Sequence, residues 1–344
     1  MHFGSHLYGV RHVLVVGSGD VASELIAYFR KLGKDRCAIV GCIVPGSATL
    51  PATLEGAPVI GGADRMHDYL FRNSVDVVVF AQPLDSIPKV GDLVGSALQL
   101  GIRVGILPEF YVLPLEDLPA AKVHVGDLLG YPMALLSTVS QGHCYLLAKR
   151  LLDITVSAIG LLLLSPFLLI IAVAVKVSSP EGPVFYPWRV LGTNRKPFVG
   201  YKFRTMVPHA DRLKKELMHL NEMEGPVFKI QNDPRITPIG RTLRKYSLDE
   251  LPQLYSVLKG DMSLVGPRPP SKEEAEQYKF WQRRKLCVKP GITCLWQING
   301  RNEIKSFDEW AKLDLEYIEH ASFWLDLQIL ARTVPAVLLG RGAC

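Results

Sequence analysis

Apolar residues in the first 127 positions come in short runs, and stretches with helical periodicity separate these runs. The pattern predicts a helix at residues 20–32 and strands at residues 12–16, 37–44, 75–81 and 102–106. Strands that alternate with helices are typical of a doubly wound α/β sheet. We therefore expect a Rossmann-like domain over residues 1–128 and a connector over residues 129–148.

A glycine-rich turn, GSGDVA at residues 17–22, follows the first expected strand. Its form is GxGxxA, and a strand-to-helix turn is where a dinucleotide-binding fingerprint belongs. However, the second strand ends without the acidic residue that would bind a ribose, and Asp20 brings a negative charge to the place of a pyrophosphate. Gly17 and Gly19 are thus weak cofactor-binding candidates. A regulatory or structural domain is expected here rather than a dehydrogenase.

The longest apolar run is the charge-free stretch at residues 154–175, ITVSAIGLLLLSPFLLIIAVAV. As a straight helix it would measure about 33 Å, enough to cross the hydrocarbon core of a bilayer. Ser165 and Pro166 lie at its middle. Because proline cannot donate to the carbonyl of Leu162, the helix should kink or break there.

Basic residues flank this run on both sides, with Lys149 and Arg150 before it and Lys176 after it. The flanks therefore give no clear membrane orientation. We expect residues 149–178 to enter the membrane and return to the same face as a re-entrant hairpin, with a kinked single span as the alternative. Asp153 should pair with Lys149 or Arg150 at the interface.

Composition supports a folded, membrane-associated protein. Hydrophobic residues make up 48% of the 344, which excludes disorder, and the mean hydropathy is +0.17. Six scattered cysteines exclude a disulfide scaffold and make a zinc site unexpected.

Charge divides the chain in two. Residues 1–148 hold 10 basic and 13 acidic side chains, whereas residues 149–344 hold 29 basic and 20 acidic ones. The second part should therefore face phosphates or an anionic surface. Nucleic acid is not an expected partner, because no nucleic-acid-binding motif accompanies the charge.

Candidate chemistry is concentrated at residues 235–269. Apolar spacing predicts a helix at residues 250–258, with Ser247 and Glu250 as a capping box, and another amphipathic helix at residues 208–223. Asp249 and Glu250 are adjacent acids among several basic residues. Such a pair suits a carboxylate nucleophile or a divalent-cation site.

Four segments of the second part resemble, in order, the signatures of the bacterial sugar transferase family, the monotopic polyprenyl-phosphate phosphoglycosyl transferases. They are KFRTM at 202–206, SLDELP at 247–252, VGPRP at 265–269 and KPGIT at 289–293. The resemblance covers about residues 145–344. It implies a mainly helical, membrane-associated catalytic domain at residues 179–344.

The resemblance also implies a reaction. Hexose 1-phosphate, with glucose or galactose as the sugar, passes from a UDP-sugar to undecaprenyl phosphate with Mg²⁺, UMP is released, and polysaccharide assembly begins. Asp249 would be the nucleophile and Glu250 its base or metal-site partner. Phosphate-binding cations would be Lys202, Arg204, Arg244 and Arg268, and possible nucleotide-sugar contacts would be Gln297, Asn299 and Arg301.

The family resemblance further implies a homodimer with both soluble modules on the cytoplasmic face of the bacterial inner membrane. Larger members of the family begin with four membrane helices, and we expect none before residue 154 here. From the residues alone, an alternative stays open: a membrane-tethered nucleotide-sensing regulatory or scaffold protein whose basic half binds lipid.

Overall fold

The computed structural model describes residues 11–46, 50–108, 122–139, 141–299, 304 and 306–338. The chain divides into two compact units, Met1–Ser140 and Gln141–Cys344, each with its own core. The two units are described separately below.

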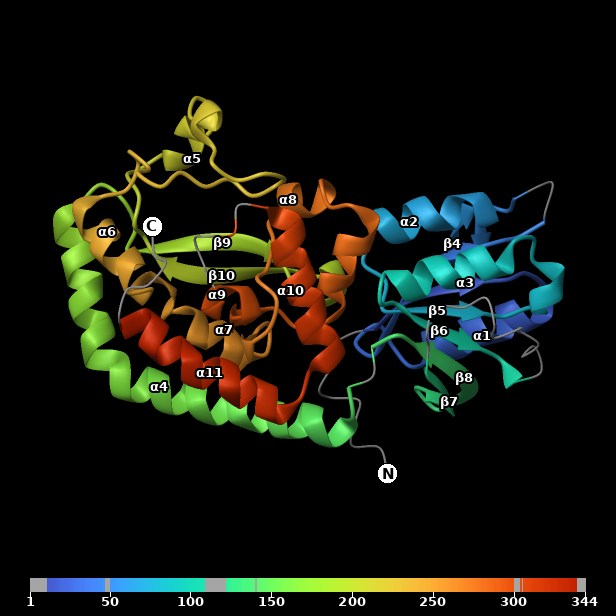
Figure 1. Ribbon diagram of the computed structural model, residues 1–344. Coiled ribbons are helices and arrows are strands. Elements are labelled where there is room, and N and C mark those ends of the chain that lie inside the picture. The colour runs from blue at the N-terminus through green and yellow to red at the C-terminus, as the bar shows by residue number, and fades with distance from the viewer. Residues whose placement is uncertain are drawn as a thin grey trace. The chain divides into compact units, whose positions relative to one another are not determined.

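The described residues of the first unit form a mixed eight-stranded sheet in the order β3-β4-β2-β1-β5-β6-β8-β7 (Figure 1). Five neighbouring strands, from β4 to β6, are parallel, and the edge strands are antiparallel to their neighbours. The strands are β1 (Arg11–Val16), β2 (Cys37–Ile43), β3 (Thr53–Leu54), β4 (Ala57–Gly61), β5 (Val77–Phe80), β6 (Arg103–Ile106), β7 (Lys122–Leu128) and β8 (Tyr131–Ser137).

Helices cover both faces of this sheet. Helix α1 (Gly19–Lys31) packs its Leu25 and Phe29 on the face that carries Val13 and Val77. The alternate residues of β1 and β5 are also fully buried, as they must be where α2 (Met66–Arg72) and α3 (Val90–Gln99) cover the opposite face. The doubly wound α/β prediction is therefore confirmed for the parallel part of the sheet.

The expected connector at residues 129–148 has a different structure. It contains β8, which forms a hairpin with β7 through a turn in which Leu129 and Gly130 both have positive φ. This hairpin extends the sheet by two antiparallel strands, and the boundary between the units falls after Ser140.

The second unit is mainly helical, as predicted, with two small sheets. A hairpin joins β9 (Phe185–Leu191) to β10 (Pro197–Phe203), and β11 (Ser263–Val265) pairs in parallel with β12 (Gly291–Thr293). The helices are α4 (His143–Ser178), α5 (Ala210–Leu213), α6 (Pro238–Lys245), α7 (Gln253–Lys259), α8 (Lys272–Glu276), α9 (Leu295–Ile298), α10 (Phe307–His320) and α11 (Phe323–Leu338).

Helix α4 is the one described helix that is long and apolar enough to cross a membrane. Only 11% of its most apolar window is buried, which is unlike the core helix of a soluble protein. The helix continues through Pro166 without the break that was one of the expected outcomes, and it bends along its length (Figure 1). The Ser165 hydroxyl donates to the Leu162 carbonyl at 2.8 Å and replaces the hydrogen bond that proline cannot make.

Two local predictions are wrong. Residues 208–223 form only α5 and a 3₁₀ turn at Met218–Leu220, because the apolar side of the expected helix finds no surface on which it could be buried. The expected helix at 250–258 begins at Gln253, after a 3₁₀ turn at Leu248–Glu250. Ser247 has φ +52°, and its side chain forms no capping hydrogen bond in this described turn, so the capping box is absent there.

Candidate functional site

A cavity of about 620 Å³ lies in the second unit. The β9–β10 hairpin, α6, the 3₁₀ turn at Leu248–Glu250, the segment after β11, and α9 contribute to its walls. Seven of the residues singled out from the sequence line this one cavity: Lys202, Arg204, Arg244, Asp249, Glu250, Arg268 and Gln297. Among the described lining residues Asn299 does not occur, and Arg301 lies outside the described part of the chain.

The two acids occupy a tight turn between α6 and α7. Thr237 caps α6 by accepting from the Gly240 amide at 3.0 Å, and Pro238 takes the first helical position. After α6 the chain reverses at Ser247 and presents Asp249 and Glu250 to the cavity. Asp249 is only 9% exposed, so its carboxylate is largely shielded from bulk water.

The end of strand β10 supplies two cations to the cavity, Lys202 within the strand and Arg204 directly after it. Phe203 between them also lines the cavity and packs with Ile171 and Val175 of α4. Lys202 Nζ donates to Glu250 Oε1 at 2.7 Å, and both side chains are mostly buried. The hairpin thus holds one of the two acids in an ion pair.

Trp188 of β9 connects two of the phosphate-binding candidates. Its ring centroid lies 4.1 Å from Lys202 Nζ and 5.7 Å from the Arg268 guanidinium carbon. Arg268 also lies 3.4 Å from Glu274. Burial acts to lower the pKa of Arg268, but the combined effect of Glu274, Tyr278 and Glu250 outweighs burial and the pKa is raised. Arg268 is therefore a permanent cation in the cavity wall.

The other cavity arginines have different partners. Arg244 Nε donates to Thr205 Oγ1 at 2.9 Å. Arg235 forms a buried ion pair with Asp233, a residue pair that the sequence analysis missed. Burial acts to raise the pKa of Asp233, but hydrogen bonds and charge from Arg235 outweigh it, so the pKa is lowered. The signal was present in the sequence, since Asp233 and Arg235 stand only two positions apart.

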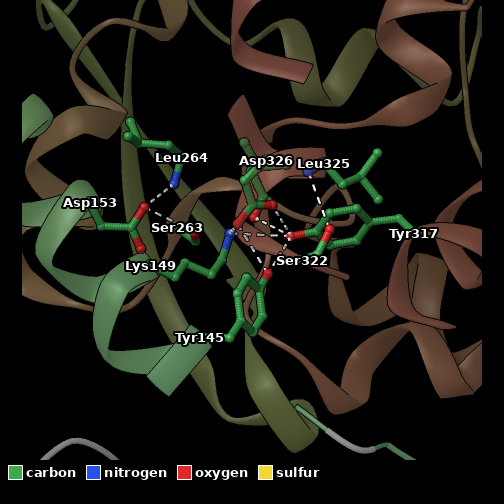
Figure 2. A network of polar contacts seen from close by, with 10 residues as sticks. Tyr145, Lys149, Asp153, Ser263, Leu264, Tyr317, Ser322, Leu325 and Asp326 are labelled. Carbon is green, nitrogen blue, oxygen red and sulfur yellow. Dashed lines mark hydrogen bonds and ion pairs between the residues drawn. The ribbon is translucent and has the colours of Figure 1, made fainter. Parts of the chain in front are cut away.

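Helix α4 forms hydrogen bonds with β11, as Figure 2 shows. Asp153 is 2% exposed and accepts from the Leu264 amide at 2.9 Å and from the Ser263 hydroxyl at 3.0 Å. The expected ion pair between Asp153 and Lys149 or Arg150 is therefore replaced by a bond to β11. The segment after β11 carries Arg268.

Lys149 pairs instead with Asp326 of α11 at 2.8 Å, beside the hydroxyls of Tyr145 and Tyr317 (Figure 2). Arg150 donates to the carbonyls of Val257 and Leu258, at the carboxyl end of α7. The first turns of α4 are thus bonded to three different elements of the second unit.

Two adjacent carboxylates in the cavity lining, Asp249 and Glu250, are the candidates for a metal. Within the described residues there is no group of three or more His, Cys, Asp or Glu side chains that could hold an ion. Mg²⁺, however, commonly takes one or two carboxylates and completes its shell with water and substrate phosphates. Asp249 and Glu250 fit that mode of binding.

In the first unit, the glycine-rich turn lies between β1 and α1 as predicted. The Gly17 amide donates to Ile43 at 2.9 Å, and a Cβ on Gly17 would stand 3.0 Å from the Ala81 carbonyl. Gly19 has φ +77°. The close packing of three strands already explains why position 17 is a glycine, with no need for a bound nucleotide. Cofactor binding by Gly17 and Gly19 therefore stays a prediction.

Comparisons with known proteins identify the family of this chain. The model of the bacterial sugar transferase family matches residues 144–340. Galactosyl transferase CpsE of Streptococcus agalactiae serotype III (strain NEM316) is 41% identical over 78% of this chain and 59% of its own length. The UDP-glucose:undecaprenyl-phosphate glucose-1-phosphate transferase of Xanthomonas campestris pv. campestris is 31% identical over 98% of this chain and 68% of its own.

The chain thus spans less than two thirds of the length of the first of these relatives. Among solved structures, the crystal structure of RSP, a Rex-family repressor, matches 33% of this chain and 52% of its own at 16% identity, with a TM-score of 0.28. That similarity is too low to bear on the fold or on the activity.

Proposed function

The chain belongs to the bacterial sugar transferase family, and from this premise we propose that it transfers hexose 1-phosphate from a UDP-sugar to undecaprenyl phosphate. Glucose or galactose is the sugar, and UMP is the second product. The reaction begins the assembly of an exopolysaccharide, capsule or O-antigen. The observation that carries the proposal is the meeting of Asp249, Glu250 and four cations, from separate sequence motifs, in one cavity.

In the first step, an oxygen of the Asp249 carboxylate attacks the β-phosphorus of the UDP-sugar. The bond from that phosphorus to the bridging oxygen breaks, and UMP leaves with the electron pair. The sugar phosphate stays on Asp249 as an acyl phosphate. Lys202 and Arg268 lie where they stabilise the negative charge that builds up on the phosphate oxygens.

In the second step, an oxygen of the lipid phosphate attacks the same phosphorus and Asp249 leaves as a carboxylate. The product is a lipid-linked diphosphate sugar, and the enzyme returns to its initial state. Glu250, held by Lys202, lies next to the reacting carboxylate, where it accepts a proton from a monoprotonated acceptor phosphate.

Asp249 and Glu250 are also the residues that would hold Mg²⁺, together with the substrate phosphates. The ion supplies charge neutralisation of the diphosphate when it is bound. The exposed apolar surface of α4 favours a place at the membrane, and we include in the proposal a homodimer with its soluble parts on the cytoplasmic face of the inner membrane.

The test is UMP release by the full chain in lipid nanodiscs supplied with undecaprenyl phosphate and, in turn, UDP-glucose and UDP-galactose. We expect release with at least one donor, and no release by Asp249→Asn although that variant still binds the nucleotide sugar. Lys272→Ala, an exposed change outside the cavity lining, is the matched control and should behave as wild type. Normal turnover by Asp249→Asn would overturn the covalent mechanism.

A further inference from the structure

Arg204 is a buried cation whose charge lacks an acidic partner within the described part of the chain. It is 7% exposed and lines the cavity. Its Nη2 donates to the Ser179 carbonyl, while Nε and Nη1 are buried and make no hydrogen bond to any described residue. Burial of a guanidinium whose donors lack acceptors raises the free energy of the folded protein, unless an anion completes its hydrogen bonds.

Three other cations of the cavity differ from Arg204 in this respect. Lys202 is paired with Glu250, Arg268 with Glu274, and Arg235 with Asp233, so each has its charge balanced before any substrate arrives. Arg244 forms no ion pair with a described acid either, but it is only half-buried and its Nε donates to Thr205 Oγ1. Arg204 is the more deeply buried of these two arginines and is therefore the better prepared to receive an additional anion.

The position of Arg204 indicates which anion it would bind. Its backbone amide donates to Val184 and its side chain to Ser179, so it is bonded at both ends to the segment that directly follows α4. The neighbouring Phe203 packs on Ile171 and Val175 of α4 itself. Arg204 thus lies at the side of the cavity where the apolar helix ends, whereas Lys202 points to the catalytic acids.

We propose that Arg204 binds the phosphate monoester of the acceptor lipid and holds it for attack on the phosphosugar carried by Asp249. The inference rests on the proposed function and divides its site into two phosphate subsites. A lipid whose chain stays in the bilayer reaches the cavity from the end of the membrane helix. The donor diphosphate then occupies the side lined by Lys202 and Arg268.

Gly182 provides an independent way to disturb this subsite. A Cβ at position 182 would stand 1.4 Å from Arg204 Nη1, so only glycine leaves room for the guanidinium. Gly182→Ala displaces the guanidinium and keeps its charge. It should reproduce the defect of Arg204→Lys, which keeps the charge and loses the planar donor set.

The experiment separates the two half-reactions in nanodiscs. With UDP-hexose alone, we expect the UMP burst of Arg204→Lys and Gly182→Ala to match that of wild type within about twofold. With undecaprenyl phosphate added to the preformed intermediate, transfer should slow roughly 10²-fold, and the KM for the lipid should rise. Arg241→Ala, an exposed arginine outside the cavity lining, should leave both half-reactions unchanged.

The outcomes distinguish the sources of the phosphate. A burst that falls as much as the transfer would assign Arg204 to the nucleotide diphosphate and overturn the proposal, as would normal transfer in both variants. Absence of a UMP burst in the wild-type protein would instead overturn the proposed function itself. Thermal unfolding in the same nanodiscs, compared with wild type, establishes that the variants are folded.

Discussion

Asp153, near the beginning of the membrane helix, accepts a hydrogen bond from the backbone amide of Leu264, 111 positions further along the chain. Leu264 lies in β11, directly before the segment that brings Arg268 to the cavity. The same carboxylate also accepts a hydrogen bond from the Ser263 hydroxyl. One buried side chain of α4 thus fixes the strand from which a phosphate-binding arginine extends.

Removing this carboxylate should loosen β11. We expect Asp153→Ala to lower the free energy of unfolding by about 3 kcal/mol, because a buried amide and hydroxyl lose a charged acceptor. The KM for the UDP-sugar should rise as Arg268 loses its fixed position. Denaturant unfolding and steady-state kinetics in detergent micelles measure both effects. Asp68→Asn, at an exposed carboxylate of α2, is the control, and an Asp153→Ala protein as stable as this control would contradict the prediction.

The Ser165 hydroxyl should matter only while Pro166 is present. Ser165→Ala leaves the Leu162 carbonyl without a donor in an apolar segment, and we expect a loss of about 1 kcal/mol. In Pro166→Ala, the backbone amide at 166 is restored and donates to Leu162, so the same serine change should cost less. A double-mutant cycle on unfolding in bilayers measures the coupling. Equal costs in both backgrounds would show that the hydroxyl does not replace the missing bond.

The bend in α4 bears on membrane topology. If α4 is re-entrant, single cysteines placed just before Lys149 and just after Lys176 should both react with an impermeant reagent added from the cytoplasmic side. Reaction from opposite sides would establish the kinked single span. Pro166→Ala, which should straighten the helix, is expected to shift labelling toward that second pattern.

Trp188 should position Lys202 and Arg268 through its ring faces. Trp188→Leu removes both cation–π contacts, and we expect the KM for the UDP-sugar to rise about tenfold while stability falls less than in a core deletion. Trp188→Phe keeps an aromatic face and should recover most of the loss. Initial-rate kinetics with varied donor provide the measurement, and equal kinetics for the Leu and Phe variants would contradict the role of the ring.

The Asp233–Arg235 pair should make stability depend on pH. Because the pKa of Asp233 is lowered in the folded chain, its contribution is complete above the unfolded pKa of about 4 and disappears as the pH falls through the folded value. Asp233→Asn should cost about 2 kcal/mol at pH 7, since the cavity partly screens the pair. The difference from wild type should shrink below pH 4 in denaturant titrations. A cost that does not vary with pH would show that the effect comes from packing.

Local patterns accounted for much of this structure. Four of the five parallel strands and α1 follow from short-range patterns, whereas β4 was not predicted. Helix α4 follows from the long apolar run, and the family resemblance drawn from four motifs is confirmed by the match over residues 144–340. Seven expected site residues meet in one cavity, and five of them belong to the four motifs. The β7–β8 hairpin was not predicted, because β8 lies within the range that was interpreted as a connector.

The predictions that were wrong concern segments whose structure depends on residues far away in the sequence. The helix expected at 208–223 has the right period, but periodicity cannot supply a surface for its leucines to pack on. Asp153 was expected to pair with Lys149 or Arg150, whereas its hydrogen-bond partners lie more than 100 positions away. Arg204 has buried hydrogen-bond donors and no described acid paired with it, and this environment likewise depends on all the segments that form the cavity wall.

The hydrogen bonds and ion pair made by the first turns of α4 determine how this protein can be truncated. A fragment beginning at residue 179 would contain the complete cavity lining, yet it would lose the groups that secure β11, the end of α7 and α11. Trimming the hydrophobic helix is therefore no route to a water-soluble catalyst. The same piece of chain is apolar enough for attachment to a bilayer and holds the elements around the reaction centre, so its removal would take away both functions.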